Sequence, residues 1–178
     1  MNVKFLNPFV EAANEVLEAE AQTVMKRGNL TLQKSSLTAD EVTVMLSLVG
    51  QVQGVVFYGM SVATGLALVS RVMAQQFKTF DALAQSGVAE LGNVITGRAS
   101  IKLAEAGYIA NISPPALIQG QSVTISTFDF SRIVVPLSCE FGNLMVHLAV
   151  RESPSNARNA NYAPVVGGMA MAVGELGK

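Results

Sequence analysis

The most distinctive chemical feature of the chain is a carboxylate and a carboxamide, Glu90 and Asn93, spaced three positions apart. On a helix this spacing places the two side chains one turn apart, so both can reach the same external group. At about 100° per residue, Ser86, Gly97 and Ser100 share one strip with them, within an arc of roughly 80°. The small side chains of these neighbours leave the helix backbone accessible, so another molecule could approach it closely. The alternative is an ordinary solvated pair without a function.

The element that must position this pair is one helix predicted over Lys78–Gly107, the longest helical pattern in the chain. Thr79 or Asp81 can cap its start with a side-chain oxygen, and Gly107 can end it in the left-handed conformation. Each glycine in a helix interior costs up to about 1 kcal/mol relative to alanine. Glycine recurs in this interior at Gly87, Gly92 and Gly97. We expect the close approach of a second molecule to compensate for that cost.

Composition places the chain among compact globular proteins, because 50% of its 178 residues are hydrophobic and only 14% are charged. The net charge is −1 without a cluster of Lys or Arg, which argues against a nucleic-acid partner. No apolar run approaches the roughly twenty residues needed to cross a bilayer, so no membrane insertion is expected. The N-terminus has no signal-peptide pattern and the single cysteine cannot form an internal disulfide, so we expect a cytoplasmic protein.

The remaining candidates for chemistry are weak. Cys139 lies in a strand-like run beside Glu140, and we interpret it as a core or near-turn residue rather than a nucleophile. His147, the only histidine, is interpreted as a half-buried strand residue, because a zinc site would need several further ligands. The sequence therefore predicts no metal site, no Ser/His/Asp set and no glycine-rich phosphate loop.

Helical and strand-like patterns alternate along the chain. A first helix is expected to open at Pro8 and to end near Gly28, and Ser61 is expected to cap a second helix that runs to about Gln76. The strands predicted before the long helix are Leu30–Leu37, Val42–Val49 and Val55–Met60, with a hairpin turn at Gly50–Gly54. Those predicted after it are Tyr108–Ser113, Ala116–Ile118, Leu144–Val150 and an expected antiparallel pair, Val123–Phe128 with Ile133–Cys139.

This order of elements suggests two pseudo-equivalent halves. We predict an α/β fold of the α+β type: a pseudo-twofold repeat of a helix plus antiparallel strands, with a sheet of about six strands and long helices packed on it. The Glu-x-x-Asn spacing recurs in the first helix as Glu11 and Asn14. Residues 1–150 are assigned to this domain. Residues 151–178, rich in Ser, Asn, Ala and Gly, are interpreted as an appendage that is flexible or docks on the body or a partner.

The run from Ser86 to Gly107, with Pro114-Pro115 after it, resembles the signature of the CheC/CheX/FliY family of chemotaxis phosphatases. The pattern Ser86-x-x-x-Glu90-x-x-Asn93, followed by Gly97 and the proline pair, is far more restrictive than Glu-x-x-Asn alone. The resemblance covers roughly residues 1–150 and is greatest to the CheX members, which have a single strong motif.

The resemblance implies a phosphatase that acts on a CheY-type response regulator carrying an aspartyl phosphate. The regulator of such a pair holds its own Mg²⁺, so no cofactor is expected on this chain. Asn93 would orient a water in line with phosphorus, and Glu90 would pair with a lysine of the regulator. Ser86, Gly97 and Ser100 would line the docking surface. The resemblance also implies a homodimer.

The second motif departs from the family pattern, because Glu11 and Asn14 lack the surrounding glycines and the later proline, and Asn7 stands where an acidic or hydroxyl residue is expected. We interpret this pair as a weak second site or a degenerate relic. A different function also stays open: a non-catalytic module that binds a regulator or takes part in a flagellar switch. Retention of both Glu90 and Asn93 favours the enzyme, since mere binding has no evident need for the amide.

Overall fold

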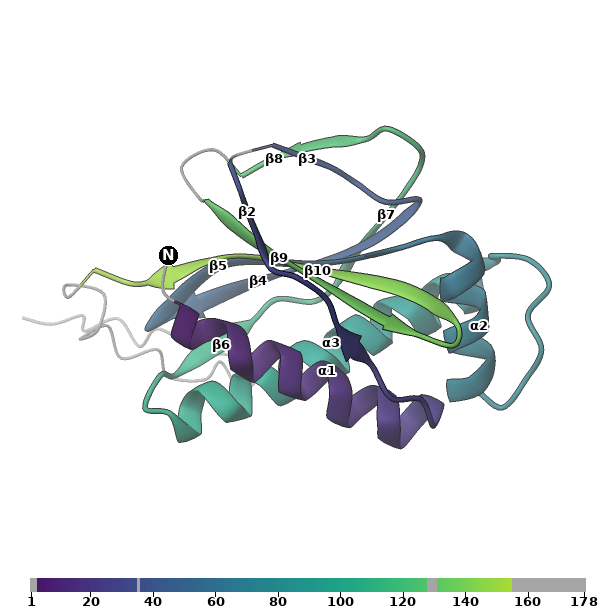
Figure 1. The fold of residues 1–178 in the computed structure, drawn as a ribbon, viewed down its shortest axis with the longest axis horizontal. Helices are drawn as coiled ribbons and strands as arrows, with labels where there is room; N and C mark the ends of the chain where they lie inside the picture. The colour runs from purple at the N-terminus through teal and green to yellow at the C-terminus, as the bar shows by residue number, and fades with distance from the viewer. Residues whose placement is uncertain (1–2, 35, 128–130, 155–178) are drawn as a thin grey trace, which may run out of the picture.

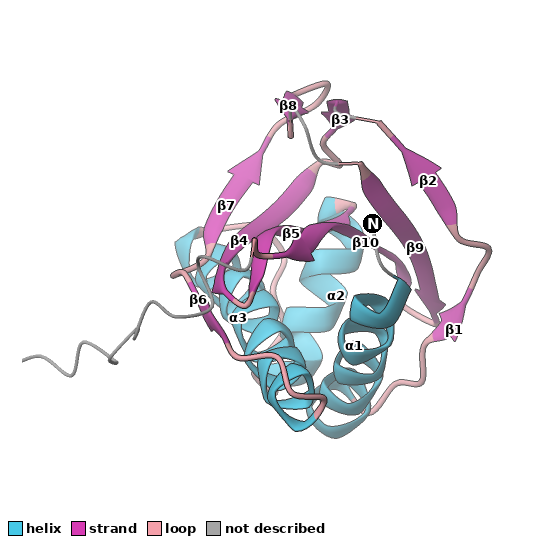
Figure 2. Ribbon diagram, turned by 90° about the vertical axis from the view of Figure 1, so that its left-hand side faces the viewer, coloured by secondary structure: helices cyan, strands magenta, loops and turns pink. Residues whose placement is uncertain are grey.

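The fold is α+β: three α-helices pack on one face of an antiparallel sheet, as the computed structural model shows for residues 3–34, 36–127 and 131–154 (Figure 1). Turned by 90°, the same fold shows a ribbon of two short strands, β3 and β8, over the opposite face of the sheet (Figure 2). After a 3₁₀ turn at Val3–Phe5, the helices are α1 (Leu6–Ala21), α2 (Val62–Val72) and α3 (Ala82–Glu105).

The main sheet has six lateral positions, with strands in the order β1-β9-β10-β5-β4-β6. Each edge position holds two short strands, because β2 also pairs with β9 and β7 also pairs with β4. The sequence predicted a sheet of about six strands, and this number is correct for the strands side by side across the sheet. The strands are β1 (Lys26–Arg27), β2 (Thr31–Gln33), β3 (Ser36–Thr38), β4 (Val42–Gly50), β5 (Val52–Met60), β6 (Ala110–Ile112), β7 (Ala116–Gln119), β8 (Thr124–Ser126), β9 (Arg132–Cys139) and β10 (Gly142–Glu152).

The predicted pseudo-twofold repeat is confirmed by the pairings. The hairpin β4–β5 corresponds to β9–β10, and the two inner strands, β5 and β10, pair at the centre of the sheet with Tyr58 opposite Val146. The edge strands β1 and β2 on β9 correspond to β6 and β7 on β4, and β3 pairs with β8. This correspondence makes α1 and α3 equivalent helices, and they pack against each other beneath the sheet (Figure 2).

The core lies between the helices and the inner face of the sheet. Phe9 and Leu17 of α1, Ile95 of α3, Leu46 of β4 and Val146 of β10 are all fully or almost fully buried in it. Burying an aliphatic or aromatic side chain of this size contributes about 1.5–3 kcal/mol, so the apolar sides of both long helices fix them on the sheet.

Local signals set the starts of α2 and α3 as predicted, whereas α1 begins at Leu6, two residues before Pro8. Asp81, rather than Thr79, caps α3, because its Oδ1 accepts a hydrogen bond of 2.9 Å from the backbone N–H of Ala84. Ser61 caps α2 by accepting from the N–H of Thr64 at 3.1 Å. Gly107 follows α3 with φ +87°, a left-handed conformation that glycine adopts without steric cost.

The first helix is shorter than predicted. It ends at Ala21 instead of near Gly28, and Gln22 takes a left-handed conformation with φ 53°. The residues expected to finish the helix, Lys26 and Arg27, form β1 on the edge of β9. Backbone pairing to an open sheet edge outweighs the helix-ending signal of two basic residues before a glycine. The second helix is also shorter and ends at Val72 rather than near Gln76.

The predicted pairing of Val123–Phe128 with Ile133–Cys139 is wrong. The strand that forms there, β8, pairs instead with β3, with Ile125 opposite Leu37. The reason is that β9 has β10 on one side and β1 and β2 on the other, so both of its edges are occupied. Phe128 lies outside the described residues.

The sheet extends past the boundary assigned at residue 150. Arg151 and Glu152 continue β10, and the backbone N–H of Ser153 donates to the carbonyl of Gln51 at 2.9 Å. The Ser153 hydroxyl donates to the carbonyl of Gly50. The rest of the expected appendage, from residue 155, lies outside the described residues. No helix within the described ranges is long and apolar enough to span a membrane.

Candidate functional site

Glu90 and Asn93 lie on the outer side of α3, where Glu90 is exposed and Asn93 is half-buried. The Asn93 amide Nδ2 donates a hydrogen bond of 3.3 Å to the Glu90 carboxylate Oε2. The amide oxygen Oδ1 accepts no hydrogen bond from any described residue, so it stays available to a water or a partner. The Glu90 carboxylate therefore orients the Asn93 amide, while the amide oxygen remains free to accept a hydrogen bond.

The helix beneath the pair is held tightly on the sheet. The Thr96 hydroxyl donates to the Gly92 carbonyl at 2.7 Å, and Tyr58 of β5 lies 2.9 Å from the same hydroxyl oxygen. Because the Thr96 proton is already used, the Tyr58 hydroxyl is the donor of the second bond. Burial raises the pKa of Tyr58, which keeps it protonated as that role requires. This buried chain of hydrogen bonds ties the middle of α3 to the central strand, about one helical turn from Asn93.

The glycines of α3 mostly serve internal packing, which corrects the expectation that they clear a path for a partner. A Cβ on Gly87 would lie 2.3 Å from Val69 Cγ2 of α2, and one on Gly92 would lie 2.8 Å from Val44 Cγ1 of β4. Only Gly97 faces open space, with no atom nearer than Ile112 Cδ1 at 4.0 Å. The sequence could not separate these cases because the direction of each glycine depends on where α2 and β4 lie.

The two serines of the predicted docking strip differ in their surroundings. The exposed Ser86 hydroxyl donates to the Ala82 carbonyl at 2.9 Å within its own helix. The half-buried Ser100 hydroxyl donates to the Ala110 carbonyl at 2.8 Å, a bond that ties α3 to β6. The structure therefore gives Ser100 an internal role, and of the strip only Ser86 and Gly97 lie open beside Glu90 and Asn93.

Three exposed apolar residues accompany the pair on the outer side of α3, and sequence reasoning did not single them out. Leu83, Val94 and Ile101 are 49%, 41% and 52% exposed. Their spacing from Glu90, seven positions before and then four and eleven after, places them within roughly 40° of it at 100° per residue. The sequence signal for these three residues is their helical spacing, which places them on the same side of the helix as Glu90.

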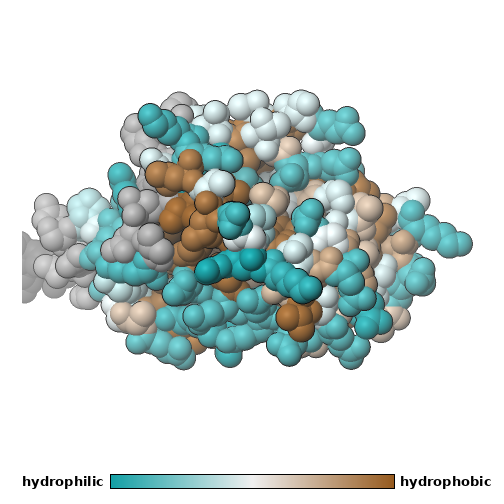
Figure 3. Space-filling view, viewed as in Figure 1, coloured by the Kyte–Doolittle hydropathy of each residue, from teal (hydrophilic) through white to brown (hydrophobic). Residues whose placement is uncertain are grey.

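The second Glu-x-x-Asn pair, on α1, faces a different environment. The ammonium of Lys102, from α3, lies 3.4 Å from Glu11 Oε2 and 2.6 Å from Glu15 Oε1. Asn14 Oδ1 is buried and has no hydrogen-bond partner in the described part of the chain. The outward surface along α1, at the lower edge of the view, is mostly hydrophilic (Figure 3). The structure thus engages the carboxylate and covers the amide oxygen of this second pair.

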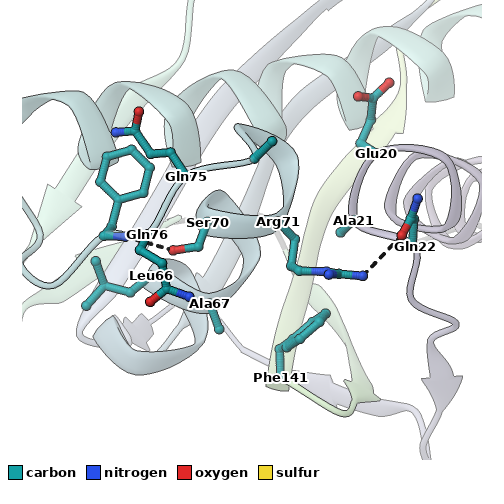
Figure 4. Close-up of a pocket in the computed structure, with 12 residues that line it drawn as sticks. Glu20, Ala21, Gln22, Leu66, Ala67, Ser70, Arg71, Gln75, Gln76 and Phe141 are labelled. Carbon is teal, nitrogen blue, oxygen red and sulfur yellow. Dashed lines mark hydrogen bonds between the residues drawn. The ribbon is translucent and has the colours of Figure 1, made fainter.

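A cavity among the described residues lies away from both pairs. It has a volume of about 670 Å³ and lies between the end of α1, α2 and the turn carrying Phe141 (Figure 4). Within this cavity, Arg71 Nη2 donates a hydrogen bond of 3.1 Å to Gln22 Oε1, and this bond links α2 to α1. The Glu90–Asn93 pair instead lies on a convex helix surface. Such a surface suits a protein that brings its own active-site cleft better than it suits a small substrate.

The class of protein follows from this fold and this pair together with the family comparison. The model of the family described as chemotaxis phosphatase CheX matches residues 42–138, which is more than half of the chain and includes Glu90 and Asn93. The chain therefore belongs to the CheX family, and the resemblance noted from the sequence is confirmed.

Particular relatives agree with this assignment. The chain is 25% identical over 129 residues to the CheY-P phosphatase CheX of Thermotoga maritima, covering 72% of this chain and 83% of that protein. Its fold matches a CheC-like superfamily protein from Shewanella sp. PV-4 with a TM-score of 0.77, 27% identity, and 85% and 99% of the two chains covered. It also matches Borrelia burgdorferi CheX in its complex with CheY, BeF₃ and Mg²⁺, with a TM-score of 0.70, 28% identity, and 85% and 100% coverage.

Proposed function

We propose that this protein dephosphorylates a phosphorylated CheY-type response regulator, using Glu90 and Asn93 as its contribution to the active site. The observation that carries the proposal is the exposed, hydrogen-bonded Glu90–Asn93 pair on a helix fixed rigidly to the sheet. Membership of the CheX family supports it, as do a relative named as a CheY-P phosphatase and a relative crystallised with CheY.

Asn93 enters the regulator's active site and orients the attacking water. Its free Oδ1 accepts a hydrogen bond from that water and directs an oxygen lone pair towards phosphorus, in line with the bond to the aspartyl oxygen. The water attacks phosphorus, the bond from phosphorus to the aspartyl oxygen breaks, and inorganic phosphate leaves while the aspartate recovers its carboxylate. Since the chain supplies orientation rather than a nucleophile, the rigid seating of α3 under Asn93 is the property that matters.

Glu90 anchors the regulator and holds the amide. One carboxylate oxygen accepts from Asn93 Nδ2, which leaves the other oxygen for a lysine ammonium of the regulator. A cation bound there fixes the docking register and keeps Asn93 aimed at the phosphate. Both effects depend on Glu90 being exposed, as it is in the structure.

The docking surface is the outer side of α3. Leu83, Val94 and Ile101 give it apolar area that loses water contact on binding, and Gly97 leaves room for the partner's backbone. Ser86 forms its polar margin. The partner therefore presents apolar residues around the rim of its phosphorylation site.

The remaining parts of the proposal concern the cofactor, the location and the oligomer. Mg²⁺ belongs to the regulator, where it neutralises the phosphoryl oxygens, so this chain acts without a cofactor of its own. We place the protein in the cytoplasm with its regulator and assign it a homodimer. Light scattering coupled to size-exclusion chromatography tests the dimer by giving twice the 18.7 kDa chain mass or the single mass.

Turnover separates the enzyme from a module that only binds or sequesters the regulator. The test is to phosphorylate the CheY-type regulators of the source organism with acetyl phosphate, remove the donor, and follow phosphate release with this protein at one-twentieth of the regulator concentration. An enzyme converts the whole regulator pool many times faster than spontaneous decay. A binding module leaves the rate of the excess regulator unchanged, and that result would replace the proposal with the binding function.

A further inference from the structure

Helix α3 rests on a buried tyrosine of the central sheet. Tyr58 of β5 lies on the inner face of the sheet in a row with Val44 of β4 and Val146 of β10. A Cβ on Gly92 would lie 2.8 Å from Val44 Cγ1 and 3.4 Å from Tyr58 Cδ2. Because Gly92 has no side chain, the helix backbone directly before Asn93 can pack against this row.

The carbonyl of Gly92 accepts one hydrogen bond more than a regular helix provides. The helix pattern pairs this carbonyl with the backbone N–H of Thr96. The Thr96 hydroxyl donates to it as well, at 2.7 Å, and the Tyr58 hydroxyl, 2.9 Å away, donates to the Thr96 oxygen. Thr96 is 0% exposed and Tyr58 is 1% exposed, so bulk water does not compete for either bond.

These contacts bear on Asn93 through the peptide bond. The Gly92 carbonyl and the Asn93 N–H belong to one planar peptide unit, so a contact that fixes the carbonyl also fixes the backbone of Asn93. The Thr96 hydroxyl holds that unit through the carbonyl, and the close approach of Gly92 to Val44 holds it against the sheet. At the other end of the side chain, the Glu90 carboxylate accepts from Asn93 Nδ2 at 3.3 Å. The Asn93 side chain is thus held both at its backbone and at its amide.

Two other buried polar side chains lie on the opposite face of the sheet and take no part in these contacts. His147, predicted from the sequence to be half-buried, is 5% exposed and borders the space beneath the β3–β8 ribbon. Arg132 is 0% exposed, and its Nη2 donates at 2.7 Å to the Ser36 carbonyl at the border of that space. Tyr58 and Thr96 lie instead between the sheet and α3, the helix that carries the proposed site.

The corresponding turn of α1 has no side chain that could make this bond. Three positions after its asparagine, α1 has Leu17 where α3 has Thr96. Directly before the asparagine, α1 has Ala13 where α3 has Gly92. Because the leucine side chain has no donor, the carbonyl one turn before it cannot be held in this way. The hydroxyl bond therefore accompanies the open Glu-x-x-Asn pair and is absent from the covered one.

From these contacts we infer that Tyr58 and Thr96 are positioning residues of the phosphatase reaction, which act through the Gly92 carbonyl to hold Asn93 at the angle that the attacking water requires. The inference rests on the proposed function, because it assigns the two hydroxyls to the step in which Asn93 orients the water. Neither hydroxyl can touch the regulator, since both are buried. Their removal should therefore lower kcat and leave KM, which depends on docking at the exposed side of α3, nearly unchanged.

The test uses two variants in which stability and positioning change in opposite directions. Tyr58→Phe/Thr96→Val replaces both hydroxyl-bearing residues with apolar ones of similar shape and leaves no buried hydroxyl unpaired, so it should be about as stable as wild type. Thr96→Ser removes a buried methyl group and should be less stable, but it keeps the hydroxyl. We expect the double variant to lose about tenfold in kcat, and Thr96→Ser to stay within about twofold of wild type.

Phosphate release over a range of phosphorylated-regulator concentrations gives kcat and KM, and urea unfolding gives the stability of each variant. KM should stay within about twofold of wild type in both variants. Tyr58→Phe alone keeps the bond from Thr96 to Gly92 and should lose about threefold in kcat, so it carries the same test if the double variant does not fold. A wild-type kcat in either variant that lacks the tyrosine hydroxyl, or a kcat that follows stability across the series, would overturn the inference. Absence of turnover by the wild-type protein would contradict the proposed function itself, and the inference with it.

Discussion

The two long helices carry the same Glu-x-x-Asn spacing at equivalent places in the pseudo-twofold fold, yet the structure leaves only one pair open. On α3, Glu90 bonds to Asn93 and both face outwards. On α1, Glu11 contacts Lys102 of the other helix, and the Asn14 amide oxygen is buried. A motif that is identical in spacing therefore differs in whether its chemistry is accessible.

The residues that surround the two motifs on their helices also differ. Four positions after the glutamate, α3 has Val94 where α1 has Glu15, and seven positions after it, α3 has Gly97 where α1 has Glu18. An acidic helix surface repels a phosphorylated, anionic active site, whereas an apolar and open one accepts it. The comparison teaches that the neighbours of the pair, more than its spacing, decide whether the pair lies on an open, apolar helix surface or on an acidic one.

After replacement of Asn93 itself, replacement of Glu90 should lower the rate most. Glu90→Ala should lower kcat/KM for phosphorylated regulator by about tenfold to a hundredfold, because both the lysine contact and the orientation of Asn93 are lost. Initial rates of phosphate release measure it. Glu11→Ala is the matched control and should stay within about twofold of wild type. Equal losses in both variants would mean that α1 also carries a working site.

An acidic residue transplanted from α1 should close the docking surface of α3. Val94→Glu copies Glu15, and we expect it to weaken binding of the BeF₃-activated regulator about tenfold at low salt through like-charge repulsion. Isothermal titration at low and high salt measures the effect, which should shrink as salt screens the charges. Val94→Leu keeps the apolar character and serves as the control. Unchanged binding by Val94→Glu would place the docking surface elsewhere.

The glycines of α3 should respond in opposite directions. Gly92→Ala forces a Cβ to 2.8 Å from Val44 and should destabilise the fold by about 1–3 kcal/mol. Gly97→Ala meets no such contact and should stabilise it by about 0.5–1 kcal/mol, because alanine restricts the unfolded chain and favours helix. Urea unfolding monitored by circular dichroism gives both values. Destabilisation of similar size in both variants would contradict the packing described for α3.

The smallest effect concerns the ion pairs that join α1 to α3. Hydrogen bonds from Lys102, and then from Arg98, lower the pKa of Glu15 from its ordinary value of 4.5. A lowered folded-state pKa contributes stability above pH 4.5 that disappears as the pH falls through the lower value. Glu15→Gln should therefore be slightly less stable than wild type at pH 7, and this deficit should vanish in acid. A deficit that persists at low pH would show that packing, rather than charge, is responsible.

The sequence was sufficient for features that local signals determine. The presence of α3, with Asp81 as one of its two candidate caps, and the positions of α2, β4 and β5 follow from side chains close together in the chain. The exposed pair was also found because helical spacing alone places Glu90 beside Asn93.

What the sequence could not supply depends on contacts between distant segments. The strands β3 and β8 are three residues each, and their pairing joins Leu37 to Ile125 across about half of the chain. The internal role of Ser100 required the position of β6, and the engagement of Glu11 required the position of Lys102. None of these contacts leaves a periodic signal in the local sequence.

The most direct test of the account compares the two asparagines in one assay. Phosphate release from an excess of phosphorylated regulator is measured with wild type, Asn93→Ala and Asn14→Ala, together with binding of each variant to the BeF₃-activated regulator. The account predicts that Asn93→Ala binds the regulator but loses about a hundredfold or more in rate, as expected when a group that positions the reacting water is removed, while Asn14→Ala retains the wild-type rate. Wild-type turnover by Asn93→Ala would contradict it.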